Sequence, residues 1–272
     1  MGKALELLSG RVTAPGGTIT AITMNTGNSA QIRNTPIGAD IRLLNWWARN
    51  NAAGISRIRS PKLHDNVQGI RNRITANDPS GLNTSGTWQK LVAQDVLTLE
   101  LSGSAVGGQI ETFHQLVYYA DLPGADARFI DPAELLRRQV NDLTIEVAIT
   151  AGATGDYTGQ VAINSLFDLL KANTDYAIVG YTVDTLCSAV RFTGPDFGNL
   201  GLGGPGLNTQ RWYTARWFYH LSQQLGMPLI PVFNSANKGG TLVDVVQNQA
   251  AAAVNVNIAC FELAAPGASS NK

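Results

Sequence analysis

The side chains that most often carry catalysis or bind metal ions are few in this chain and far apart in its sequence. The three histidines are His64, His114 and His220, and no His-x-x-His, Cys-x-x-Cys or His-x-Glu spacing joins them. Cys187 and Cys260 each lie inside an apolar run, where a thiol usually behaves as a small buried side chain. Because a metal site needs several converging ligands, we expect no metal, no cofactor and no disulfide framework.

Two other patterns suggest chemistry but lack residues that the chemistry needs. The glycine-rich segment 198–206 offers amides to an oxyanion, yet it has neither the Gly-Lys-Ser/Thr of a phosphate loop nor its strand–helix context. Ser9, Ser102 and Ser104 adjoin glycines without forming the Gly-x-Ser-x-Gly turn of a serine hydrolase. We interpret the glycine segment as a connecting loop, and we predict that the protein is not an enzyme. The one kind of catalytic site left open is a pair of carboxylates that only folding would bring together.

Basic side chains gather in the first half of the chain, where Asp65 is the only acidic residue in the same stretch of sequence. Such a strip of positive charge fits phosphate groups of a packaged genome or acidic residues of a neighbouring subunit. A solvated strand face is the third reading, and the sequence does not decide among them. The candidate contact residues are Arg57, Arg59, Lys62, Arg71 and Arg73.

Aromatic side chains form two clusters, one in each half. In the second half, Tyr213, Trp217 and Leu221 share one helical stripe, which favours packing within the chain. Trp212 and Phe218 lie off that stripe, which suggests that part of the helix faces another chain. The candidate subunit-interface aromatics are Trp46, Trp47, Trp212, Trp217 and Phe218.

The same pattern occurs twice along the chain, which is the first feature to look for in any sequence. Placing Asp40 on Asp175 aligns the two copies, and one extra residue in the first copy brings Arg57 onto Arg191. Both copies close with a strand followed by Pro-Gly, and the offset grows from 134 residues at the arginine to 143 at that turn. The second copy therefore carries about nine extra residues, which we place near segment 211–228.

Short alternating or β-branched runs predict strands, and two segments have helix signals. Asp131 precedes a proline and a glutamate as an N-cap does, and the other helix ends at Gly226. The expected strands include 97–101, 143–149, 176–183 and 254–263, and the expected helices are 131–140 and 209–225.

Many short strands with few helices predict a mainly β protein made of two tandem antiparallel β-sandwiches of the jelly-roll kind. We expect the first sandwich over residues 1–128, a linker helix over 129–142 and the second sandwich over 143–272. The order of the strands is not readable from the sequence.

Composition excludes several classes of protein. The chain is 44% hydrophobic and 15% charged, and 20 basic residues balance 20 acidic ones. This balance indicates no overall affinity for nucleic acid or membranes. The N-terminus lacks the apolar run of a signal peptide and no run approaches the length of a membrane span, so we expect a soluble protein made in the cytoplasm.

The tandem repeat, the low charge and the lack of a catalytic cluster resemble the double jelly-roll major capsid proteins of tailless icosahedral viruses. The segments SPKLHDNVQGIR and PVFNSANKGGTLVDVV also resemble phage structural proteins. The resemblance implies a self-assembling capsid subunit, located in the virion, whose trimers form pseudo-hexameric tiles of an icosahedral shell. Its partners would then be copies of itself, other virion proteins and the packaged nucleic acid, with no membrane insertion.

Two other functions stay open from the sequence. A decoration or minor shell protein of a tailed phage fits the small size of both copies. A carbohydrate-binding β-sandwich fits if the tryptophans are exposed and stack on sugar rings.

Overall fold

The computed structural model of the protein describes residues 2–63, 65–76, 88–150, 152, 154–207, 211–247 and 252–266. His64 lies outside the described residues. The same is true of Gly267, where the second Pro-Gly turn was expected.

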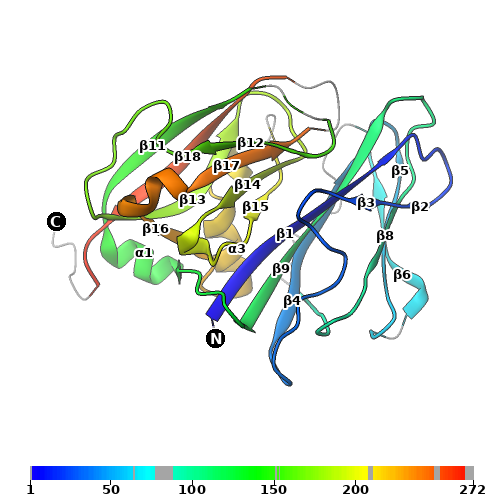
Figure 1. Cartoon of the computed structure of the whole chain (residues 1–272), viewed down its shortest axis with the longest axis horizontal. Helices are drawn as coiled ribbons and strands as arrows, with labels where there is room; N and C mark the ends of the chain where they lie inside the picture. The colour runs from blue at the N-terminus through cyan, green and yellow to red at the C-terminus, as the bar shows by residue number, and fades with distance from the viewer. Residues whose placement is uncertain are drawn as a thin grey trace.

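The first half of the chain forms two antiparallel sheets that lie one on the other (Figure 1). One sheet has the order β3-β1-β9-β4-β7, and its strands are β1 (Gly2–Thr13), β3 (Thr23–Met24), β4 (Ile41–Arg49), β7 (Gln89–Lys90) and β9 (Ile110–Leu122). The other has the order β2-β8-β5-β6, and its strands are β2 (Thr20–Ala21), β5 (Gly54–Ser60), β6 (Asp65–Ile74) and β8 (Thr98–Leu101).

The second half forms two further antiparallel sheets. The first has the order β10-β16-β13-β18-β11, with β10 (Phe129–Ile130), β11 (Gln139–Ile149), β13 (Asp175–Val183), β16 (Ile230–Asn234) and β18 (Val254–Leu263). The second has the order β12-β17-β14-β15, with β12 (Tyr157–Ala162), β14 (Ala189–Thr193), β15 (Leu202–Gly204) and β17 (Leu242–Val246). Two short 3-10 helices connect strands of this half. They are η1 (Pro195–Phe197), between β14 and β15, and η2 (Ser235–Gly240), between β16 and β17.

The strand order of the two halves is the same. In order across the sheets, β1-β9-β4-β7 corresponds to β11-β18-β13-β16, and β2-β8-β5-β6 corresponds to β12-β17-β14-β15. Each half thus contains eight equivalent strands in two packed sheets, which is the jelly-roll arrangement. The predicted fold class, a mainly β chain of two tandem sandwiches, is confirmed.

Irregularities in the strands repeat as well. The pairing of β4 with β9 shifts at Leu44, and the pairing of β13 with β18 shifts at Val179, the residue that the sequence alignment places on Leu44. The pairing of β1 with β9 shifts at Lys3, and that of β11 with β18 shifts at the equivalent Val140. Because bulges are specific local features of a strand, their coincidence fixes the residue equivalence of the two copies.

The extra residues of the second copy form the helices α2 (Arg211–Thr214) and α3 (Trp217–Leu225) between β15 and β16. The single helix expected there is interrupted after Thr214, and it ends at Gly226, which adopts the left-handed conformation with φ of 62°.

The predicted linker is shorter than expected. Asp131 caps α1 (Pro132–Arg138) by accepting a hydrogen bond from the backbone nitrogen of Glu134 at 2.7 Å. The residues on both sides of α1 belong to β10 and β11, which are strands of the second sandwich. Within 129–142, only Asp131 and α1 therefore lie outside the sheets.

Candidate functional site

The two sandwiches are joined through faces that are not equivalent. The outward face of β1, β9 and β4 packs on the side of the second sandwich that carries β12, β14 and β15 (Figure 1). The backbone nitrogen of Leu7 donates to the carbonyl of Gly201 at 2.6 Å, and Trp47 Nε1 donates to the carbonyl of Ser188 at 2.9 Å. The junction is therefore a head-to-tail contact between unlike sheets, rather than a symmetric contact between like ones.

Apolar side chains dominate this junction. Leu5, Leu7 and Leu116 belong to the same buried cluster as Leu202 and Trp217 of the second half. Glycine is needed at position 203, because a Cβ there would lie 2.0 Å from the carbonyl oxygen of Val190 on the neighbouring strand β14 and 2.9 Å from the Leu7 side chain across the junction. The glycine segment, which the sequence indicated to be a plain connecting loop, thus includes a short buried strand at the junction.

A buried polar cluster lies in the middle of the junction. Ser9 Oγ lies 2.8 Å from Nδ1 of His114 and 2.6 Å from the hydroxyl of Tyr157, which belongs to the second sandwich. Ser9 and His114 are fully buried. The serine–histidine pair resembles part of a nucleophilic site, but it is covered by the second sandwich, so its evident role is to join the two units. Sequence reasoning missed it because the three residues are far apart along the chain.

Burial sets the protonation of this cluster. Burial, with a smaller contribution from nearby Arg49, lowers the pKa of His114 to about 3. The imidazole is therefore neutral at physiological pH, and its ring stacks on Trp47 with 5.3 Å between the ring centres.

Each sandwich contains one arginine–carboxylate pair at the equivalent place. Arg191 on β14 pairs with Asp244 on β17, with 2.5 Å between Nη2 and Oδ2. Arg57 on β5 pairs with Glu100 on β8, with 2.5 Å between Nε and Oε2. The sequence alignment had placed Arg57 on Arg191, but neither acidic partner was identified. The pair in the second sandwich is covered at the junction, where the guanidinium lies 3.3 Å from the ring centre of Tyr157.

The predicted basic strip is partly neutralised. Arg57 and Arg59 both bind Glu100, and although burial alone would raise the pKa of this carboxyl group, the two hydrogen-bonded guanidinium groups lower it below its usual value. Glu100 is distant in sequence, which is why Asp65 seemed to be the only acidic neighbour. Arg71 and Arg73 on β6 are exposed.

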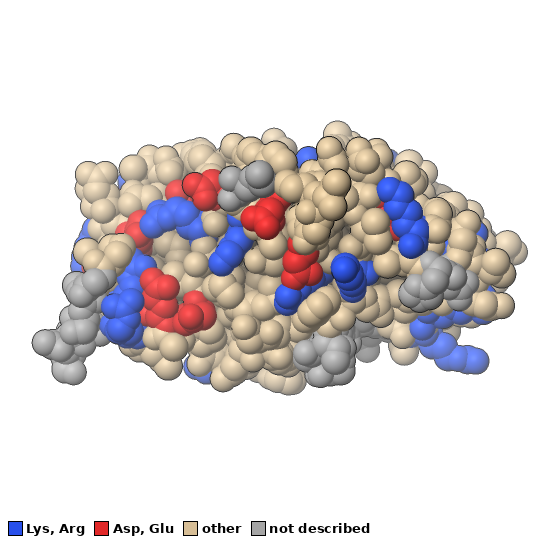
Figure 2. Space-filling model, turned by 90° about the horizontal axis from the view of Figure 1, so that it is seen from below, with Lys and Arg blue, Asp and Glu red and all other residues tan. Residues whose placement is uncertain are grey.

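The rest of the strip forms only backbone or uncharged contacts among the described residues. Lys62 Nζ donates to the carbonyl of Ala93 at 2.9 Å, and Arg71 donates to the carbonyl and the side chain of Gln68. Seen from below, acidic and basic side chains lie next to each other over the second sandwich and the junction, whereas the end formed by the first sandwich shows mainly basic ones (Figure 2).

The prediction of subunit-interface aromatics is wrong for four of the five residues. Trp46 stacks on Phe113 inside the first sandwich. The other three buried residues belong to the cluster that fills the second sandwich and the junction; they are Trp47, Trp217 and Phe218. Trp212 alone is exposed, at 72%. A helical stripe predicts burial but does not show what covers the rest of the helix. Phe218, which lies off the stripe, packs on Tyr181 and Phe192 of the second sandwich, whereas Trp217 meets Trp47 at the junction.

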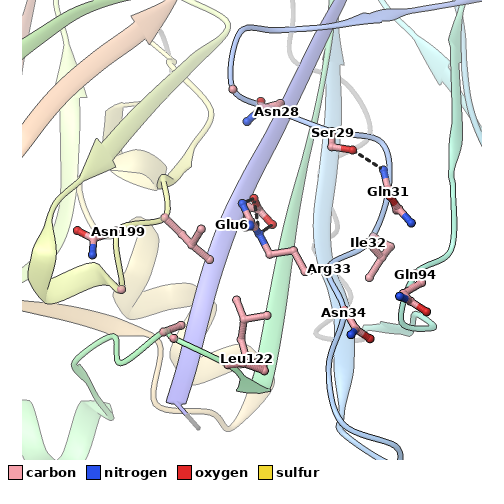
Figure 3. Close-up of a pocket in the computed structure, with 16 residues that line it drawn as sticks. Glu6, Asn28, Ser29, Gln31, Ile32, Arg33, Asn34, Gln94, Leu122 and Asn199 are labelled. Atoms are coloured by element: carbon pink, nitrogen blue, oxygen red, sulfur yellow. Dashed lines mark hydrogen bonds and ion pairs between the residues drawn. The ribbon is translucent and has the colours of Figure 1, made fainter.

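A polar cleft opens where the two sandwiches meet (Figure 3). Its volume is about 860 Å³, and its wall includes the ion pair of Glu6 and Arg33, with 2.9 Å between Arg33 Nε and Glu6 Oε2. Asn28 and Asn34 of the first half and Asn199 of the second also line it. Because Arg33 is neutralised by a buried carboxylate, the cleft offers mainly uncharged hydrogen-bonding groups.

The described part of the chain holds neither a metal-ligand cluster nor a disulfide. No group of three or more histidine, cysteine, aspartate or glutamate residues is placed so as to hold a metal ion. Cys187 and Cys260 are free and buried. None of the described helices is long and apolar enough to cross a membrane.

Comparison with known proteins gives distant likenesses only. No protein-family model and no curated protein matches the chain. Among solved structures, the PBSX exported protein XepA is similar at 12% identity and a TM-score of 0.22, covering 91% of this chain and 88% of that one. The major capsid protein of bacteriophage PM2 has 10% identity and a TM-score of 0.21, with coverage of 97% and 99%. A chain of Sulfolobus turreted icosahedral virus has 10% identity and a TM-score of 0.24, with coverage of 96% and 91%. At these values, the function has to be argued from the geometry of the chain itself.

Proposed function

We propose that this protein is a structural virion protein, a self-assembling capsid subunit whose trimers act as pseudo-hexameric tiles of an icosahedral shell. The observation that carries the proposal is the head-to-tail contact between two equivalent jelly rolls. A contact between unlike faces leaves one face of each kind unused at the two ends of the chain. Repetition of such a contact closes a ring when the rotation from one unit to the next divides a full turn, and the proposal requires a rotation that closes after six units.

The duplication sets the size of that ring. Three chains with two units each place six similar units around one axis, and a six-sided tile covers a surface with nearly equivalent contacts. Jelly rolls recur in viral shells, as well as in lectins and cupins, so the fold is compatible with this role without establishing it. In this proposal the protein is not an enzyme, and it is located in the virion together with other virion proteins.

The oligomeric state tests the proposal directly. Size-exclusion chromatography with light scattering at micromolar concentration is expected to give trimers or larger particles, and negative-stain images are expected to show six-sided tiles or shells. A protein that stays monomeric over the whole range of concentration and salt would overturn the proposal.

A decoration or minor shell protein is the second candidate. It differs in one measurable respect, because such a protein binds a shell formed by another protein and forms no closed particle alone. Closed particles from the purified chain would therefore favour the capsid subunit. The carbohydrate-binding alternative needs exposed aromatic platforms, and it loses support because four of the five candidate aromatics are buried.

A further inference from the structure

The contact between the two sandwiches uses one face of each. The equivalent faces, one at each end of the molecule, are not used within the chain. The face of β1, β9 and β4 is covered by the second sandwich, but the equivalent face of β11 and β18 is open over the edge formed by β11. Helices α1 and α3 cover the β13 and β16 part of this same outward face, so its β11 part is the portion left open. At the opposite end, the outward face of β5 and β6 carries the basic strip.

The open and the covered face differ in chemistry at equivalent positions. The strand registers place Leu5 on Asp142 and Ser9 on Glu146, and Leu7 falls on Thr144. The two leucines of β1 are thus replaced by an acidic and a polar residue of β11, and the uncharged serine is replaced by a glutamate. Asp142 is exposed and Glu146 is partly exposed, and neither forms an ion pair with any described residue. The face that is buried within the chain is mostly apolar and carries no acidic residue at these positions, whereas its open equivalent carries two.

The basic strip occupies the complementary face. Arg57 and Arg71 are directly opposite each other on β5 and β6, so their side chains lie on the same side of the sheet. Arg59 and Arg73 follow on that side, and Glu100 is the one carboxylate that the described structure places among the four guanidinium groups. Like charges opposite each other repel, so this face is suited to a second acidic partner.

The net charge of the two halves follows the same division. Residues 1–128 contain 12 Lys and Arg and 9 Asp and Glu, a net charge of +3, whereas residues 129–272 contain 8 and 11, a net charge of −3. The zero net charge of the whole chain therefore hides a basic and an acidic half. Opposite charge at the two ends favours association in which the first sandwich of one copy meets the second sandwich of the next.

We propose that a second copy of this chain docks its β11 edge, through Asp142 and Glu146, on the basic face of β5 and β6. The inference rests on the proposed function, because it identifies the surfaces that would close the ring. Within the chain, Ser9 lies beside Tyr157 and the covered pair of Arg191. In the proposed contact, Glu146 of one copy takes the position that Ser9 has within the chain, and the ion pair of Arg57 in the next copy takes the position of the Arg191 pair. Glu146 then meets the surplus positive charge of the basic face.

Charge reversal with rescue tests the docking. In the full chain, D142K/E146K and R71E/R73E each place like charges across the contact, and each is expected to raise the dissociation constant of the oligomer by about tenfold or more. The variant that combines all four substitutions restores opposite charges with the signs exchanged, and it is expected to recover association to within about threefold of the wild type. Light scattering and sedimentation at several concentrations give these constants, and circular dichroism checks the fold.

Matched controls reverse exposed charges on other surfaces. Asp121→Lys at the end of β9 and Lys90→Glu on β7 are expected to change association by less than about twofold, since neither lies on the proposed contact. Raised salt is expected to weaken wild-type association, because exposed charges are screened.

The outcomes separate the two proposals. If the wild type assembles but the reversals leave its dissociation constant unchanged, the docking surfaces are wrong and the capsid proposal stands. If R71E/R73E abolishes retention of nucleic acid without changing assembly, the strip binds phosphate and the docking proposal is overturned. If the wild type is always monomeric, both proposals fail.

Discussion

Replacing His114 by asparagine should remove a defined part of the acid sensitivity of this protein. Asparagine is the natural choice because Asn257 occupies the equivalent position in the second sandwich. His114 is fully buried, and burial lowers its pKa to about 3, from an ordinary value of about 6.5. Below pH 6.5 the unfolded chain binds a proton at this residue that the folded chain does not bind. Stability that is present above pH 6.5 is therefore lost as the pH falls.

The size of the effect follows from that difference in pKa. Each pH unit below 6.5 lowers the free energy of unfolding by about 1.4 kcal/mol, so that about 2.7 kcal/mol is lost by pH 4.5. Urea unfolding followed by tryptophan fluorescence between pH 7.5 and 4.5 measures this change in the free energy of unfolding. All samples have the same protein concentration, because assembly also contributes to stability. The variant starts from lower stability, since it loses the stacking on Trp47, but its stability should depend much less on pH.

A control separates His114 from other titrating groups. His220 on α3 is only partly buried, so His220→Asn should keep most of the pH dependence of the wild type. Parallel loss of stability in the wild type and in His114→Asn between pH 6.5 and 4.5 would refute the reasoning.

Four further substitutions test the junction, the cores and the exposed surface. Asp244→Ala leaves the guanidinium of Arg191 buried without its partner, which should cost about 3–5 kcal/mol in the free energy of unfolding measured with urea. Gly203→Ala forces a methyl group against a backbone carbonyl, so its melting temperature should fall, by an amount equivalent to about 1–3 kcal/mol; unchanged melting would mean that the strand can move aside. Trp217→Ala should cost about 3–5 kcal/mol, whereas the exposed Trp212→Ala should stay within about 0.5 kcal/mol, and equal losses would contradict the assignment of core and surface.

The repeat was predictable because equivalent residues follow one another in the same order along both copies of the sequence. Asp40 directly precedes β4 and Asp175 begins β13, and the two strands have the same length. The structure adds a bulge at the same place in both, so the alignment held residue by residue. Terminal strands and the cap at Asp131 were also visible, since alternation and capping depend on neighbours in sequence.

Contacts that the fold creates were not predictable. The charge of Arg57 looked free because its partner Glu100 is 43 residues away, on a strand whose place in the sheet depends on the jelly-roll topology. Trp47 looked available because no local pattern shows that a second sandwich covers β4. Burial at a junction between units depends on which faces meet, and periodicity within one strand carries no information about that choice.

The divergence of the two copies has a physical reason if the chain assembles. A contact within one chain is permanent, so apolar side chains such as Leu5 and Leu7 stabilise it without exposing an apolar surface to water. The equivalent contact between chains must be exposed while the subunit is free, and an apolar face of that size would cause aggregation. In the proposed assembly, the acidic and polar side chains of Asp142, Thr144 and Glu146 keep this face hydrated in the free subunit and select the basic face of another copy. Duplication followed by exchange of apolar for acidic residues on one face therefore makes one contact permanent and the other dependent on concentration and salt.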